Sequence, residues 1–196
     1  LETTGYGICV DDYMQTSNKD IFAVGDCAEK VSFFTKKPSN LRLASIATNE
    51  ARIAAANLYE IRRKNKGAIG VYSTCIGEPG VSFGAAGLSE TEAEKAGLSY
   101  ISGEMETVDK HPGSMPGSRK MRIKLLFEKA AGILIGGQVT GGPTTGEIVN
   151  NISALIGGGK TLEDIITFQA GTHPLNTPSP VAYPLNRAAE DAKYKK

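Results

Sequence analysis

Asp26 is the first residue of the sequence whose type and position suggest a binding role. It follows residues 21–24, a short apolar run bounded by polar residues that predicts a buried strand. Gly25 lets the backbone approach another group, and the carboxyl end of a strand is where α/β sheets bind ligands. A carboxylate there can accept hydrogen bonds from the hydroxyls of a sugar or a ribityl chain. The alternative is a plain strand whose aspartate caps the next helix.

His173 is a candidate for proton transfer. His173 and His111 are the two histidines of the chain, and neither has cysteine or acidic partners at ligand spacing, so we predict no metal site. Imidazole titrates at about pH 6.5 and can therefore act as acid and base under physiological conditions. The alternative for His173 is a structural histidine at an interface.

A long helix is predicted over residues 41–64, which are rich in alanine and carry apolar residues at helical spacing. Arginine and lysine at its C-terminal end suit the helix dipole. The backbone amides at the start of such a helix suit a carbonyl oxygen or an anion. The alternative is a structural helix buried against a neighbour.

Residues 66–70 are the predicted boundary, because the pattern beyond them changes to strands and short helices. Ser89 with Glu92, and Thr161 with Asp164, have the spacing of capping boxes that begin two helices. The predicted strands are 71–76, 81–86, 98–107, 120–128 and 133–140, with a turn at 77–80, and the predicted helices are 87–97, 144–157, 161–168 and 184–193.

Composition and motifs exclude several classes of protein. A net charge of +1 predicts no nucleic-acid or membrane partner, and no apolar run is long enough to span a bilayer. Residues 157–161 end like a phosphate-binding loop, but a predicted helix precedes them where that loop requires a strand. Three cysteines without a CxxC pair fit a reducing compartment, so we expect a cytoplasmic protein. The chain begins at Leu1 in sequence typical of the middle of a domain, so we expect a piece of a longer protein.

Three segments resemble the pyridine nucleotide-disulfide oxidoreductases, which are flavoenzymes with an FAD domain, an NAD(P) domain and a C-terminal dimerisation domain. Residues 16–28 (TSNKDIFAVGDCA) resemble the family's second FAD-binding motif. Residues 84–93 (GAAGLSETEA) and 132–138 (GILIGGQ) resemble segments of its dimerisation domain. The implied fold class is α+β: the C-terminal end of an FAD-binding α/β domain at residues 1–68, then an antiparallel-sheet-plus-helices dimerisation domain at residues 69–196.

The resemblance also implies a cofactor site for FAD. Gly25 and Asp26 would lie at the ribityl chain, which the Asp26 carboxylate would hold. Leu43, Ala44 and Ser45 would place the amides of the following helix at the pyrimidine edge of the flavin.

The implied activity belongs to a longer, homodimeric protein. It would take a hydride from NAD(P)H and pass electrons through FAD to a disulfide, a thiol-linked acceptor or oxygen. His173 would serve as acid and base across the dimer, as in the dithiol branch of the family. The redox cysteine, the N-terminal half of the FAD domain and the NAD(P) domain have no counterpart in this chain, so we expect the piece alone to be inactive. Two other hypotheses stay open: a dimerisation module without a cofactor, and an unrelated α+β ligand-binding protein.

Overall fold

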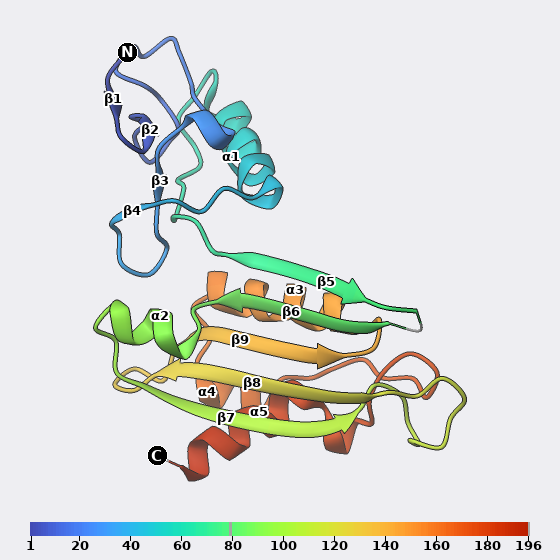
Figure 1. Ribbon diagram of the computed structural model, residues 1–196. Helices are drawn as coiled ribbons and strands as arrows, with labels where there is room; N and C mark the ends of the chain where they lie inside the picture. The colour runs from blue at the N-terminus through green and yellow to red at the C-terminus, as the bar shows by residue number, and fades with distance from the viewer. Residues whose placement is uncertain (79, 196) are drawn as a thin grey trace. The chain divides into compact units, whose positions relative to one another are not determined.

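The structure is a computed structural model that describes residues 1–78 and 80–195. The chain divides into two compact units, Leu1–Gly70 and Val71–Lys196. Figure 1 colours the first unit blue to cyan and the second unit green to red. The predicted α+β class is confirmed, because the first unit joins a helix to short antiparallel hairpins and the second joins helices to an antiparallel sheet.

The first unit has two short hairpins, a single turn of 3-10 helix and one longer helix. Its elements are β1 (Thr3–Thr4), β2 (Gly7–Ile8), η1 (Gly25–Cys27), β3 (Lys30–Val31), β4 (Pro38–Ser39) and α1 (Ala44–Asn57). β1 pairs with β2 and β3 pairs with β4, both antiparallel. Its core is a cluster of apolar side chains that joins α1 to the segments before and directly after η1: Met14, Ala23, Ala28, Ile53 and Ala54.

Residues 21–24 do not form the predicted buried strand. Phe22 makes one isolated antiparallel bridge to Gln15, and the side chain of Ile21 is 41% exposed. Ala23 alone in this run is buried in the core. A strand needs a neighbour for its backbone N–H and C=O groups, and the described residues pair this segment at one bridge only. The prediction was therefore wrong about ladder formation and about the burial of Ile21.

The helix α1 is shorter than the predicted helix over residues 41–64. It begins at Ala44 and ends at Asn57, so the basic residues 62–64 lie beyond it. The Asn57 side chain explains the stop: its oxygen accepts the backbone N–H groups of Arg62 (2.9 Å) and Arg63 (2.8 Å). Its amide nitrogen donates to the Arg63 carbonyl at 2.8 Å. These bonds fold the chain back over the helix end in place of another turn.

The second unit is a five-stranded antiparallel sheet with helices packed on it (Figure 1). Its elements are β5 (Val71–Ile76), β6 (Val81–Gly87), α2 (Glu90–Lys95), β7 (Tyr100–Val108), β8 (Lys120–Glu128), β9 (Leu134–Gly141), α3 (Thr145–Gly157), α4 (Leu162–Ile166), η2 (Pro180–Ala182) and α5 (Pro184–Tyr194). The strand order is β5-β6-β9-β8-β7. The predicted strands and helices are confirmed, close to their predicted bounds. Pro79, in the predicted turn at 77–80, lies outside the described residues.

Small residues on one face of the sheet let the helices approach closely. Ala86, Gly137, Leu125 and Gly103 are cross-strand neighbours in one row over β6, β9, β8 and β7. α3 packs over β5, β6 and β9, while α5 packs over β7 and β8. A Cβ placed on Gly103 would lie 2.0 Å from the carbonyl oxygen of Ala188 in α5. The glycine therefore fixes how near α5 can lie to the sheet.

The opposite face of β8 is largely polar. Glu104 accepts a hydrogen bond from Arg122 at 2.6 Å, and its carboxylate lies 3.2 Å from the Lys124 ammonium. The bond from Arg122, together with Lys124, lowers the pKa of Glu104 below its ordinary value. Leu126 belongs to the same face of β8 as Arg122 and Lys124, because alternate residues of a strand share a face. Unlike them it is buried, next to a register shift between residues 126 and 127.

Both predicted capping boxes are confirmed. The Ser89 hydroxyl accepts the Glu92 N–H at 3.3 Å, and the Glu92 carboxylate accepts the Ser89 N–H at 2.8 Å. Thr161 and Asp164 make the same pair of bonds at 3.2 and 2.9 Å. Residues 157–161 are therefore the end of one helix and the start of the next, as predicted. None of the helices in the described residues is long and apolar enough to cross a membrane.

Candidate functional site

Asp26 lies in the single turn η1, directly after Gly25. Gly25 has φ +71°, a conformation that residues with a side chain rarely adopt. The turn is closed by a hydrogen bond from the Ala28 N–H to the Gly25 carbonyl at 3.1 Å. The Asp26 side chain is exposed, so its carboxylate is available to hydroxyl groups of a ligand.

The start of α1 lies beside this turn. A Cβ built on Gly25 would be 3.5 Å from the Ala47 Cβ, in ordinary contact. Leu43 is the N-cap and has no side-chain hydrogen bond to the helix; its carbonyl accepts from Ala47 at 3.1 Å. The amides of Ala44 and Ser45, which are exposed residues, therefore remain at an open helix end that carries partial positive charge. The structure thus brings Gly25, Asp26 and the Leu43–Ala44–Ser45 segment together.

Arg42, which no sequence pattern distinguished, links the turn η1 to the start of α1. Its Nε donates to the Asp26 carbonyl at 3.4 Å, and its Nη2 donates to the Tyr6 carbonyl at 3.0 Å. In the sequence, Arg42 could be seen only as a basic residue near the start of a helix. Such residues are common on protein surfaces and do not by themselves indicate a binding site.

Lys30 and Glu50 were also missed. Both residues are 2% exposed, in β3 and in the middle of α1. Glu50 has helical spacing with Ile46 and Ile53, which are buried, so a charged residue on the apolar stripe was the available signal. Such a residue is unusual because buried charges need partners.

The donor set fits a flavin nucleotide. An exposed carboxylate on a fixed turn suits ribityl hydroxyls, which donate hydrogen bonds to it. An uncapped helix start beside it suits the carbonyl oxygen of a flavin ring. Asp26 supplies the first group, and Ala44 with Ser45 supplies the second.

His173 belongs to the second unit and is exposed. Its ring Nδ1 accepts a hydrogen bond from the backbone N–H of Leu175 at 3.3 Å. The backbone N–H of His173 donates to the Thr177 hydroxyl at 3.0 Å. Because Nδ1 accepts, the neutral ring carries its proton on Nε2, which faces away from this bond. Among the described residues Nε2 has no hydrogen-bond partner, so it can meet another group.

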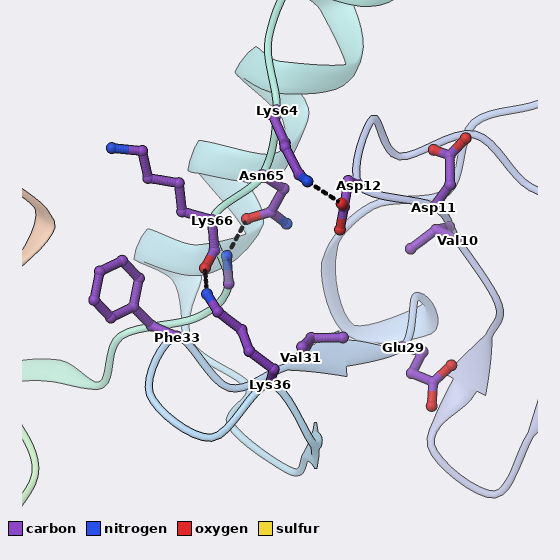
Figure 2. Close-up of a pocket in the computed structure, with 11 residues that line it drawn as sticks. Val10, Asp11, Asp12, Glu29, Val31, Phe33, Lys36, Lys64, Asn65 and Lys66 are labelled. Atoms are coloured by element: carbon purple, nitrogen blue, oxygen red, sulfur yellow. Dashed lines mark hydrogen bonds and ion pairs between the residues drawn. The ribbon is translucent and has the colours of Figure 1, made fainter.

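The first unit also contains a pocket of about 680 Å³, shown in Figure 2. Lys64 pairs with Asp12 at 2.7 Å, and Lys36 donates to the Lys66 carbonyl at 2.7 Å. In Figure 2 the ammonium of Lys66 points away from the acidic side chains. Asp26 and the start of α1 do not line this pocket. Two of the three lysines that line the pocket bond other lining residues, so we assign the pocket no ligand.

Cys9, Cys27 and Cys75 are free cysteines. Partial burial, followed by the charges of Glu29 and Glu2, raises the pKa of Cys9, which disfavours the reactive thiolate. Across residues 1–78 and 80–195, no three His, Cys, Asp or Glu side chains gather closely enough to hold a metal ion.

Comparison with protein families identifies both units. The family model for the pyridine nucleotide-disulphide oxidoreductase dimerisation domain matches residues 74–181, more than half of the chain. The chain belongs to the pyridine nucleotide-disulphide oxidoreductases. A second model of this family, described as pyridine nucleotide-disulphide oxidoreductase, matches residues 1–51 and so includes Asp26 and the start of α1. The resemblance seen in the sequence is thereby confirmed.

Relatives of this oxidoreductase family cover nearly the whole chain. An NADH oxidase from Methanocaldococcus jannaschii is 27% identical over 95% of the chain and 40% of its own length. The structure of an NAD-dependent persulfide reductase from A. fulgidus matches with a TM-score of 0.86 and 27% identity. The match covers 96% of the present chain and 34% of the reductase chain. The structure of the water-forming NADH oxidase from Lactobacillus brevis, bound to NADH, matches with a TM-score of 0.86 and 25% identity. The match covers 99% of the present chain and 42% of the oxidase chain. The chain thus spans less than half the length of these relatives.

Proposed function

We propose that this chain is the C-terminal part of an FAD-dependent oxidoreductase. The full-length protein would take electrons from NAD(P)H and pass them through FAD to a disulfide, a thiol-linked acceptor or oxygen. Residues 1–68 would complete the FAD domain, and residues 69–196 would form the dimerisation domain of a homodimer. The coverage of less than half of each relative supports a missing N-terminal part that carries the rest of the FAD domain and the NAD(P) domain.

One observation carries this proposal: the exposed Asp26 carboxylate lies on a fixed turn beside the uncapped start of α1. A hydroxyl-rich chain and a ring carbonyl can then be bound by neighbouring groups of one unit. The Asp26 carboxylate would accept hydrogen bonds from the ribityl hydroxyls of FAD. The amides of Ala44 and Ser45, with Leu43 as N-cap, would face the pyrimidine edge of the flavin.

FAD would supply the hydride- and electron-transfer chemistry between NAD(P)H and the acceptor. The residues of this chain would bind and orient it. Partial positive charge at the start of α1 would stabilise negative charge on the ring. Because the chain holds only one side of the cofactor, we expect it to retain little FAD and to be inactive alone.

His173 would serve as acid and base at a site shared across the dimer. Residues 171–176 around it are exposed, and the large apolar side chains of Leu175 and Val181 are 56% and 83% exposed. Leu175 lies in the loop of His173 and Val181 in η2 just after it, and large apolar side chains exposed so close along the chain favour a protein interface. The free Nε2 of the held imidazole is the atom that would give and take the proton.

Replacing His173 with glutamine in the full-length protein tests this role. We expect NAD(P)H-dependent turnover with a disulfide acceptor to fall about a hundredfold, because a positioned acid–base group contributes on that order. The ionisation of the imidazole should also disappear from the pH–rate profile. The control is His111→Gln, which removes the other histidine and should leave the profile unchanged. An unaltered profile for His173→Gln would reject the role.

The proposed function is tested by purifying the full-length protein. We expect a yellow protein with a flavin absorption spectrum that oxidises NADH or NADPH when oxygen, a disulfide or a persulfide is supplied. The present chain alone should be colourless, and mixing it with the separately produced N-terminal part should restore flavin binding. A full-length protein that dimerises but takes up no FAD would instead support a dimerisation module without a cofactor.

A further inference from the structure

Lys30 and Glu50 form a buried ion pair beneath the candidate flavin site. The Lys30 ammonium lies 3.0 Å from the Glu50 carboxylate, and the side chains are 1% and 3% exposed. Removing two charges from water is costly, and an apolar pair of similar size would commonly be as stable or more stable. The pair therefore needs an explanation other than stability of the fold.

Both side chains converge on the backbone of Gly25. Glu50 Oε2 accepts the Gly25 N–H at 2.8 Å. Lys30 Nζ donates to the Gly25 carbonyl and to the Ala28 carbonyl, the latter at 2.9 Å. Hydrogen bonds to charged groups are stronger than neutral ones, so the turn is held at its first residue and directly after its last. The ion pair thus holds the backbone before Asp26, at Gly25, and two residues after it, at Ala28.

The Asp26 side chain lacks such support of its own. Within the described part of the first unit, its carboxylate accepts no hydrogen bond, and Arg42 contacts only its backbone carbonyl. Its direction therefore depends on the backbone of η1, and that turn begins at a glycine with positive φ. Because glycine has more backbone freedom than any other residue, such a turn can rearrange unless other groups hold it.

We propose that Lys30 and Glu50 are positioning residues that hold the Gly25–Ala28 turn so that the Asp26 carboxylate meets the ribityl hydroxyls of FAD. This inference rests on the proposed function. It assigns the cofactor contact to Asp26 and the geometry of that contact to the buried pair. Glu50 reaches the turn from α1 and Lys30 reaches it from β3, so the pair also links the turn to the helix whose first amides face the ring.

A double-mutant cycle on FAD affinity tests the inference in the full-length apo-protein. We expect Lys30→Met to raise the FAD dissociation constant about tenfold, which corresponds to about 1.4 kcal/mol. In an Asp26→Asn background the same change should have an effect of less than about threefold, because the carboxylate it positions is gone. Equal effects in both backgrounds would overturn the positioning role.

Two further variants keep the test informative if Lys30→Met folds poorly. Lys30→Met with Glu50→Gln removes both charges and leaves an amide oxygen able to accept the Gly25 N–H; we expect it to fold and still bind FAD more weakly than the unaltered protein. Lys64→Met is the matched control, because it breaks the Lys64–Asp12 pair in the same unit, where both side chains are largely exposed. It should leave FAD affinity unchanged.

Amide hydrogen exchange gives a readout that needs no flavin. In the full-length apo-protein, we expect the amides of residues 25–28 to exchange faster in Lys30→Met and to be unchanged in Lys64→Met. Unchanged exchange in Lys30→Met would contradict the inference. If Asp26→Asn left FAD affinity unaltered while exchange still rose in Lys30→Met, the proposed flavin contact would fail and the effect of the pair on the turn would stand.

Discussion

Asp26→Ala in the full-length protein is expected to raise the FAD dissociation constant about thirtyfold. The reason is the loss of charge-assisted hydrogen bonds to ribityl hydroxyls, which together contribute about 2 kcal/mol. The exposed side chain has no partner within the described residues, so alanine should leave the fold intact. Titration of the apo-protein with FAD, followed by flavin fluorescence, measures the change.

The matched control is Asp20→Ala. Asp20 also has an exposed carboxylate, and it precedes residues 21–24 and the turn η1 in the chain. It should leave the FAD dissociation constant unchanged. If Asp26→Ala and Asp20→Ala bound FAD equally well, Asp26 would not be a flavin ligand and the site would have to be sought elsewhere.

Gly103→Ala is expected to lower the free energy of unfolding of the second unit by about 3 kcal/mol. The new Cβ would lie 2.0 Å from the Ala188 carbonyl oxygen and 2.4 Å from the Ala192 nitrogen, so it meets helix backbone and not a movable side chain. Either α5 moves off β7 or the strand bends. Equilibrium unfolding in urea, followed by circular dichroism, measures the loss.

Gly157→Ala serves as its control. Gly157 is the last residue of α3, and a Cβ there would meet nothing within 4 Å. Alanine should stabilise the helix by up to about 1 kcal/mol because it has less backbone freedom to lose. A Gly103→Ala protein as stable as Gly157→Ala would show that α5 is not held against β7 as closely as described.

The second unit was largely predictable because its signals are local. The alternation of Met121, Ile123 and Leu125 with charged residues marked β8, and two capping boxes marked the starts of α2 and α4. Each of these patterns acts within a few residues of the chain. The order β5-β6-β9-β8-β7 depends on pairing between distant strands, which no local pattern specifies.

The first unit was less predictable because its structure depends on side chains that act over distance. Asn57 ends α1 by bonding residues beyond it, although residues 58–64 have adequate helix propensity. Residues 21–24 read as a strand, but in the described chain Phe22 pairs only with Gln15. Pairing of this kind needs a neighbouring strand, and we propose that the N-terminal part of the FAD domain supplies it.

The residues proposed to bind the flavin could be named from the sequence, whereas the buried residues beneath them could not. Asp26 and the start of α1 could be found because a glycine–aspartate pair after an apolar run and the first residues of a helix have recognisable chemistry. Lys30 and Glu50 are buried and bond the backbone of Gly25. Their pairing joins residues twenty positions apart, so the sequence shows Glu50 only as a charge on the apolar face of a helix and gives no sign that Lys30 is its partner.

A crystal structure of the full-length protein with FAD tests the central claim most directly. The account predicts the Asp26 carboxylate within hydrogen-bonding distance of a ribityl hydroxyl, with the Ala44 and Ser45 amides facing the flavin ring. It also predicts that Lys30 and Glu50 keep their bonds to Gly25. Bound FAD whose ribityl chain lies away from Asp26, with the start of α1 facing solvent, would contradict it.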